Sequence, residues 1–300
     1  VGAELLLASG DRAGALSALE RGASDEAFAP LAALLLARAA ELADGSQALF
    51  YLDRAVAAAP TLASVHQQRL GARLSRGEVQ GALSDAEHLE AMAGGATATH
   101  AACARAAASL FDAGYVKEAG KLFERALRYM PDDARATAGL GRALLAAGLS
   151  ARAISLFERA ITLSEQRGEP DAQALLELGR LLADKLGDLP QAIARLRQVS
   201  PRVPEAEAAR HLEALYRAQI GDLVGASLAF GQLRETIELS GAKGALTLGR
   251  LRDAARFELA ERDDPTLAER HLALALRLSP GDGEIAAEYR RAAELLDKRQ

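Results

Sequence analysis

Two side chains that can bind a metal lie close together in the sequence, at His100 and Cys103. A spacing of three residues places both on one face of a helix, and imidazole nitrogen and thiolate sulfur are both zinc ligands. Two ligands do not make a metal site, however, and the surrounding segment HAACARAAAS is lined with alanine. We therefore favour a buried packing thiol at Cys103 over a metal or redox role. With a single cysteine, the chain forms no internal disulfide.

The other residues that could do chemistry form no catalytic motif. The histidines at positions 66, 88, 211 and 271 are predicted to lie in different helical units, as ordinary surface or groove residues, and none is flanked by a plausible nucleophile. The segment GAKGALTLG contains Lys243 but lacks the spacing of a phosphate-binding loop. Acidic residues are plentiful, but helix surfaces need them for solubility and for pairing with arginine. We predict no catalytic residue, no metal site, no cofactor and no enzymatic activity.

The composition favours helices and narrows the choice of partner. Half of the 300 residues are apolar, only 4% are aromatic, and tryptophan is absent, which suits closely packed helices better than sheets. The net charge of −5 comes from interspersed acids and bases, so we expect no nucleic acid as the principal partner. The longest apolar stretch, APLAALLLARAAELA, is interrupted by Arg38 and Glu41, and we therefore expect no direct membrane insertion.

The elements that position these residues repeat along the chain. The segment LFERA occurs twice, with Phe123 and Phe157 separated by 34 residues. Its neighbours repeat in the same register, since Gly114, Ala119, Phe123 and Ala126 align with Gly148, Ala153, Phe157 and Ala160. A period of 34 residues built from two helices is typical of tetratricopeptide arrays. The sequence thus resembles the tetratricopeptide repeat (TPR) family, and we expect a bacterial TPR-containing protein.

The resemblance covers nearly the whole chain and implies an all-α fold. The expected architecture is a right-handed superhelical α-solenoid of about eight antiparallel helix pairs with a C-terminal capping helix. We predict one solenoid domain over residues 1–300, with a partial or atypical first pair at 1–22, repeats over 28–280 and the capping helix at 283–298. The segment GRLRDAARFELAERDD departs from the family pattern and is predicted as a lengthened first helix, with its turn at Asp263, Asp264 and Pro265.

The signature residues differ in size for a physical reason. Small residues let the two helices of a pair approach closely, and large apolar residues fill the space between pairs. We assign the first role to Gly141, Gly179 and Ala153, and the second to Phe123, Phe157 and Phe230.

The family resemblance also implies a place for the partner, because first helices line the concave surface of a TPR array. Transfer by register predicts that the groove-facing residues are Arg135, Arg142, Gln173 and Arg180, with His211, Arg250 and Gln68 extending the stripe. Arginines in a groove can form bidentate bonds to carboxylates, so one hypothesis is an acidic peptide ligand. The alternative is that these arginines are simply solvated. The chain has no asparagine, so we do not predict the carboxylate clamp of chaperone-tail receptors.

A smoother second sub-site is predicted in the N-terminal half. Ala33, Ala37, Ala104 and Ala108 would leave room for an amphipathic helix to lie close to the first helices. The alternative is that these alanines pack beneath neighbouring helices.

Two classes of function follow from the resemblance. The first is a non-enzymatic scaffold or adaptor that binds another protein in its groove, within a larger complex. The second is a regulatory or sensor domain of a larger signalling or transcription-control protein. Val1 falls within a first helix that has no polar cap, so we expect the array to continue upstream or to have been trimmed. A cytoplasmic location is favoured, and a periplasmic one stays open because of the missing N-terminus.

Overall fold

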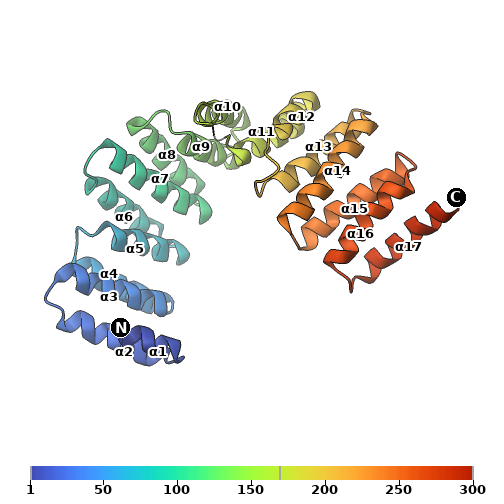
Figure 1. Cartoon of the computed structure of the whole chain (residues 1–300). Coiled ribbons are helices and arrows are strands. Elements are labelled where there is room, and N and C mark those ends of the chain that lie inside the picture. Colours follow the sequence, from blue (N-terminus) through green and yellow to red (C-terminus); the bar gives the residue numbers. More distant parts are fainter. Residues whose placement is uncertain (1, 169, 299–300) are drawn as a thin grey trace. The chain divides into compact units, whose positions relative to one another are not determined.

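The structure is a computed structural model that describes residues 2–168 and 170–298. All regular elements in these residues are helices, and their order confirms the predicted all-α array of about eight consecutive helix pairs followed by a C-terminal helix (Figure 1). The chain divides into two compact units, Val1–Leu156 and Phe157–Gln300, and each is described by itself. The single domain over 1–300 stays a prediction, and the expectation for Val1 lies outside the described residues.

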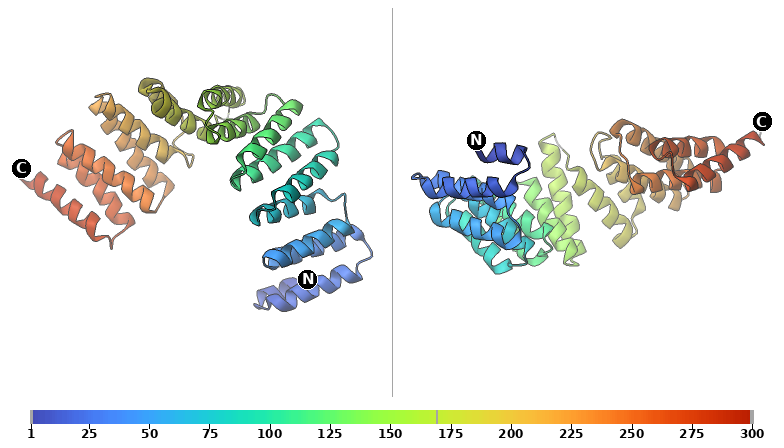
Figure 2. Two further views of the ribbon diagram at one scale, coloured as in Figure 1. Left: turned by 180° about the vertical axis from the view of Figure 1, so that it is seen from behind. Right: turned by 90° about the horizontal axis from the view of Figure 1, so that it is seen from below.

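Unit 1 consists of helices that pack consecutively along the chain, as the left view of Figure 2 shows. Its helices are α1 (Gly2–Ala8), α2 (Arg12–Asp25), α3 (Ala29–Leu42), α4 (Gly45–Ala58), α5 (Ala63–Ser75), α6 (Val79–Ala91), α7 (Ala96–Asp112), α8 (Val116–Tyr129) and α9 (Ala134–Ala146). The first helices of successive pairs, α3, α5, α7 and α9, also contact one another. Helix α10 (Ser150–Gln166) contains the division between the units.

Unit 2 is built in the same way. Its helices after α10 are α11 (Ala172–Leu186), α12 (Leu189–Arg197), α13 (Ala206–Gln219), α14 (Leu223–Ser240), α15 (Ala245–Ala260), α16 (Pro265–Leu278) and α17 (Gly283–Asp297). Helices α11 and α12, α13 and α14, and α15 and α16 form pairs, and α17 packs on α16.

The turns inside the three pairs of unit 2, α11 with α12, α13 with α14 and α15 with α16, share one device. Gly187 and Gly221 take positive φ angles of 67° and 80°, and the aspartate that follows each of them caps the next helix. Asp263 replaces the glycine with a φ of 52°, and Asp264 accepts a hydrogen bond from the backbone N–H of Leu267 at 3.1 Å. The predicted turn at residues 263–265 is therefore confirmed, and Pro265 begins α16.

The predicted small and large residues pack as expected. A Cβ atom added to Gly179 would lie 2.8 Å from Cγ of Leu196, so only glycine permits the observed approach of α11 and α12. The Phe230 ring on α14 lies 5.2 Å from the Phe257 ring on α15, which places it between successive pairs. The ring of Phe123 covers Gly139, a close contact that the sequence pattern did not predict.

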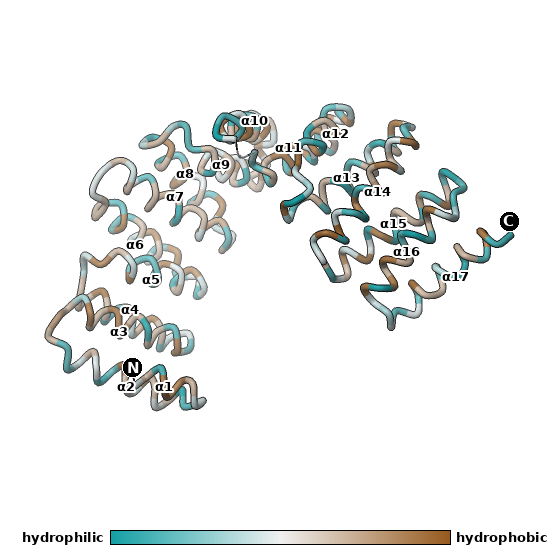
Figure 3. The backbone as a smooth tube through the Cα atoms, viewed as in Figure 1, coloured by the Kyte–Doolittle hydropathy of each residue, from teal (hydrophilic) through white to brown (hydrophobic). Residues whose placement is uncertain are grey.

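The buried residues of both units are dominated by alanine and leucine. Polar and apolar residues alternate along the helices in Figure 3, as expected when one side of each helix packs and the other is wet. None of the described helices is long and apolar enough to span a bilayer.

Candidate functional site

Two first helices of unit 2, α13 and α15, are joined by polar contacts across their neighbouring faces. Arg250 Nη1 on α15 lies 2.6 Å from Glu207 Oε1 on α13. One turn along both helices, His211 Nε2 on α13 lies 3.1 Å from Asp253 Oδ2 on α15. Thr247 also donates a hydrogen bond to Glu207, at 3.3 Å. These contacts connect the two first helices directly, without passing through the second helix between them.

The same kind of contact continues from α15 to α17. Arg252 donates two hydrogen bonds of 2.8 Å, from Nε and Nη2, to the two carboxylate oxygens of Glu288. Arg256 adds a third bond to Glu288 at 3.2 Å, and Arg252 also reaches Glu284 at 3.1 Å. The bonds from Arg252 lower the pKa of Glu288, because they stabilise its charged form. We call these contacts, from Glu207 on α13 through α15 to Glu288 on α17, the polar ladder of unit 2.

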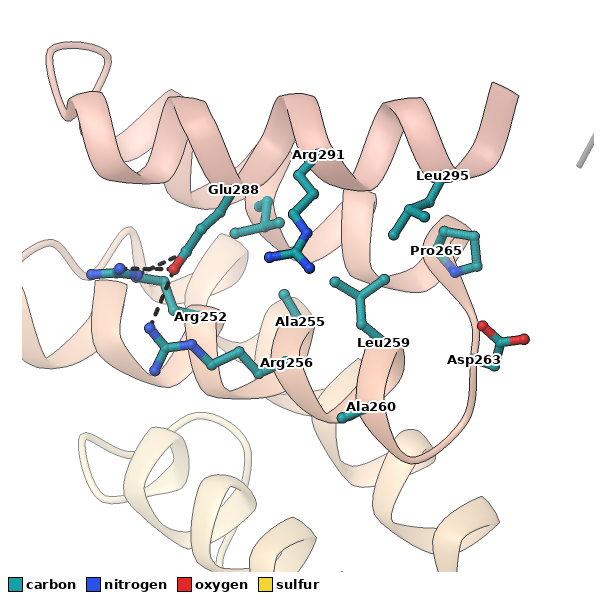
Figure 4. Close-up of a pocket in the computed structure, with 11 residues that line it drawn as sticks. Arg252, Ala255, Arg256, Leu259, Ala260, Asp263, Pro265, Glu288, Arg291 and Leu295 are labelled. Atoms are coloured by element: carbon teal, nitrogen blue, oxygen red, sulfur yellow. Dashed lines mark hydrogen bonds and ion pairs between the residues drawn. The ribbon is translucent and has the colours of Figure 1, made fainter. Parts of the chain in front are cut away.

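A pocket opens beside the contacts of Arg252 and Arg256 with Glu288, between α15, α16 and α17 (Figure 4). Its volume is about 420 Å³, within the range of ligand pockets in proteins. It is lined by Arg252, Ala255, Arg256, Leu259, Ala260, Asp263, Pro265, Leu272, Glu288, Arg291 and Leu295. Arg291 extends from α17 into this space, and within residues 2–168 and 170–298 it has no ion-pair partner. The pocket thus combines an apolar floor with a guanidinium group that is not neutralised.

The sequence-predicted site residues fall into two sets. Gln68, Arg135 and Arg142 belong to unit 1, whereas Gln173, Arg180, His211 and Arg250 belong to unit 2. Arg135 and Gln173 are exposed near the starts of α9 and α11, and Arg142 and Arg180 are half-buried further along these helices. All seven lie on first helices, as the register required.

At least five of these residues are already engaged by the chain itself, since Arg142 and Gln173 also hold contacts. Arg250 is paired with Glu207, and His211 with Asp253. Gln68 donates a hydrogen bond to Glu41 on α3 at 3.2 Å. Burial lowers the pKa of His211 even though Asp253 acts in the opposite direction, so we expect a neutral imidazole at pH 7. Because Arg250 is paired with Glu207, its contacts do not support the hypothesis that it offers a free charge to a ligand carboxylate.

Sequence reasoning missed the residues at the pocket, namely Arg252, Arg256, Glu288 and Arg291. One signal was present. Arg256 directly follows the buried small residue Ala255, just as Arg180 follows Gly179. In α15 this position is shifted from the expected register, which is why Arg250 was predicted in its place.

The alanine sub-site of unit 1 is partly closed. Ala33 and Ala37 are buried in the core of α1 to α5, so for these two residues the alternative of packing beneath neighbouring helices is confirmed. Ala104 is half-buried and Ala108 is exposed on α7, and only these two remain available to a partner.

The prediction for the histidines was wrong in two respects. His66 and His271 are buried, with exposed fractions of 2% and 1%, and are not surface residues. His66 and His88 do not lie in different helix pairs either, since their rings stack at 5.5 Å between the paired helices α5 and α6. Burial lowers the pKa of His271 to about 3. Helical periodicity places a histidine on a face but does not show how deeply a neighbouring helix covers that face.

His100 and Cys103 serve packing. The His100 side chain is buried on α7, with Nε2 3.0 Å from Asp133 Oδ2 and Nδ1 3.1 Å from the carbonyl oxygen of Ala126. Cys103 is buried as well, and burial raises the pKa of its thiol. Across the part of the chain that the structure describes, no three histidine, cysteine or acidic side chains gather as metal ligands.

The comparisons with known proteins agree with the observed architecture. Residues 110–161 match the model of the tetratricopeptide repeat family. The C-terminal part of a TPR repeat-containing protein from Cytophaga hutchinsonii is similar, with a TM-score of 0.59 and 17% identity over 85% of this chain and 97% of that one. The chain therefore has the fold of a TPR solenoid. No curated protein sequence matches it.

Two further solved structures that are similar cover most of the chain. Human IFIT1, solved as a dimer with PPP-AAAA, has a TM-score of 0.58 and 18% identity over 95% of this chain and 69% of that one. Yeast Tom70 has a TM-score of 0.55 and 17% identity over 89% of this chain and 60% of that one. At such identities the likeness shows the fold alone. TPR domains are generally protein–protein interaction modules and are usually not enzymes.

Proposed function

We propose that this chain is a scaffold or adaptor that binds a segment of another protein on its first-helix surfaces. The observation that carries the proposal is the pocket between α15 and α17, which leaves apolar side chains and a charged group open to a ligand. The TPR-like fold supports the same reading, because within each unit neighbouring first helices contact one another and offer a surface for a peptide or helix.

Two leucines of unit 2 provide a matched test of this surface. Leu295 lines the pocket and is 37% exposed, whereas Leu239 lies at the end of α14, does not line the pocket and is 80% exposed. Leu295→Ser gives up more buried area than Leu239→Ser, so circular dichroism first verifies that both variants are folded. We expect Leu295→Ser to weaken binding of a purified, stoichiometric partner and Leu239→Ser to leave it unchanged. Equal affinity of both variants and the parent would remove the pocket surface from the proposal.

Arg180, one of the arginines that the sequence places in the groove, gives a second test of the proposal. Arg180 on α11 is half-buried beside Tyr216 and, among the described residues, holds no ion pair. Arg180→Glu should weaken the binding of an acidic partner. Arg197→Glu on the second helix α12 serves as the control with the same change of charge. If the two variants bind the partner equally well, Arg180 takes no part in recognition.

A further inference from the structure

We infer that the pocket between α15 and α17 recognises an acidic amphipathic helix of the partner, which places an apolar side chain against Leu259 and Leu295 and a carboxylate on Arg291. The inference rests on the proposed function and names the chemistry of its ligand. It depends on three observations, namely the charge balance of the pocket, its apolar floor and the way in which α17 itself is held.

The charges at the pocket leave one guanidinium group, that of Arg291, for an anion. Three guanidinium groups and the carboxylates of Glu288 and Asp263 line the pocket, and Glu284 and Asp253 beside it also pair with Arg252 and Arg256. Arg252 and Arg256, both on α15, donate hydrogen bonds to Glu288 on α17. Arg291, also on α17, extends into the pocket without an ion pair to any described residue (Figure 4). A carboxylate can satisfy the planar donors of such a guanidinium with two parallel bonds.

The floor of the pocket requires an apolar group as well. Ala255 and Leu272 are buried beneath it, and Leu259 and Leu295 border it from α15 and α17. A small inorganic anion would leave this apolar surface in contact with water. A purely apolar ligand would cover Arg291 without pairing its charge, which is costly. The ligand that suits both features carries an apolar side chain and a carboxylate close together.

Helix α17 indicates how such a ligand would be arranged. It presents Glu288 and Leu295, seven residues and so about two turns apart, on the side that faces α15. In this region a carboxylate on one helix, Glu288 on α17, therefore already accepts hydrogen bonds from an arginine on another helix, Arg252 on α15. On a ligand helix, a leucine and a glutamate four residues apart share one face and can reach the floor and Arg291 together.

The test uses designed peptides and a pair of adjacent arginines. The probe is a fluorescein-labelled, alanine-rich helical peptide of about 18 residues, long enough to form a helix, that carries one Leu–Glu pair at a spacing of four. Companion peptides replace Glu by Gln or Leu by Ala. Binding to the full chain is followed by fluorescence anisotropy at low salt. We expect the Gln peptide, and the variant Arg291→Glu, each to weaken binding about 10- to 100-fold, the range for a hydrogen bond between charged groups.

The neighbouring residue supplies the control. Arg290 is exposed on the same helix, and its Nε donates a hydrogen bond to the carbonyl oxygen of Ala286 at 3.2 Å, so Arg290→Glu makes the same change of charge away from the pocket. It should alter affinity by no more than about twofold, since an exposed charge acts weakly at a distance. Equal losses for both arginine variants, equal binding of the Glu and Gln peptides, or no binding of the Leu–Glu peptide would each overturn the inference. Partner binding that depends on Leu295 would still support the proposed function in those cases.

Discussion

The two units each contain a carboxylate held by two arginines, but in different surroundings. In unit 1, Asp85 on α6 receives Arg69 and Arg73 from α5, at 2.5 and 2.8 Å. The Asp85 side chain is completely buried, and His66 lies against it with Nδ1 at 3.5 Å. This cluster joins the two helices within one pair, where no solvent reaches the acid.

In unit 2, Glu288 on α17 receives Arg252 and Arg256 from α15, at 2.8 and 3.2 Å. Its side chain is 30% exposed, and Arg256 is 62% exposed. This cluster joins the first helix α15 to the C-terminal helix α17 and borders a pocket. The same three groups therefore fix the pairing of helices where they are buried, and leave charged groups accessible to a ligand where they are not.

The largest expected effect tests the buried cluster. Asp85→Ala leaves the guanidinium groups of Arg69 and Arg73, which are only 13% and 19% exposed, without their buried partner. Removal of one member of a buried ion pair costs about 3–5 kcal/mol. We expect the urea unfolding transition, followed by circular dichroism, to shift by a corresponding amount.

Asp53 is the matched control for this prediction. It contacts the same two arginines, at 2.9 and 3.4 Å, but is 55% exposed. Asp53→Ala should cost less than about 1 kcal/mol, as expected for an exposed pair. If Asp85→Ala and Asp53→Ala lower the free energy of unfolding by the same amount, burial is not what distinguishes the two clusters.

A third acid sharpens the comparison because it is buried without a second arginine. Glu258 on α15 is fully buried and accepts a hydrogen bond from Ser227 at 2.6 Å, and Arg262 Nε is 3.6 Å from its other oxygen. Burial raises the pKa of Glu258. We expect Glu258→Gln, which keeps an acceptor for Ser227, to leave stability at pH 7 unchanged or to raise it by about 1 kcal/mol.

The pH dependence gives this prediction a sign. The folded-state pKa lies above the ordinary value of 4.5, so the folded chain binds the proton more tightly than the unfolded chain. The penalty for the charge is absent below pH 4.5 and accumulates as the pH rises through the folded-state pKa. The gain from Glu258→Gln should therefore shrink as the pH falls from 7 towards 4.5. A variant that is clearly less stable than the parent at pH 7 would show that the Arg262 contact outweighs burial.

The fold was predictable because it depends on local spacing. The 34-residue period places Phe123 and Phe157 at equivalent corners, and the turn at residues 263–265 followed from two aspartates and a proline. The close contact of Phe123 with Gly139 was missed, because Gly139 is not one of the signature positions of the repeat.

The site was less predictable because its contacts connect different repeats. The pairs Glu207 with Arg250 and His211 with Asp253 span 43 and 42 residues, and neither distance equals the repeat period. Register could place Arg250 and His211 on first helices, but it could not show that acids of the neighbouring first helix would engage them. The pocket also depends on α15, where register indicated Arg250 and the pocket is lined by Arg252 and Arg256.

The smallest expected effect tests the exposed cluster. Glu288→Gln removes the charge that Arg252 and Arg256 share, and it should cost about 0.2–1 kcal/mol. Because terminal helices of a repeat array contact only their neighbours, we expect the loss to appear as faster amide hydrogen exchange in α17 and not in α13. Glu284→Gln, with one contact to Arg252 and a side chain that is 78% exposed, should change exchange less.

Acid should reproduce the effect of Glu288→Gln in the parent chain. The pKa of Glu288 lies below its ordinary value of 4.5, mainly because Arg252 bonds the charged form. Its contribution is therefore present above pH 4.5 and is lost as the pH falls through the folded-state pKa. Exchange in α17 of the parent should approach that of Glu288→Gln in this acidic range, once corrected for the intrinsic rate. Exchange that stays slower in the parent at every pH would mean that the amide substitution disturbs packing, and that the charge of Glu288 is not what holds α17 on α15.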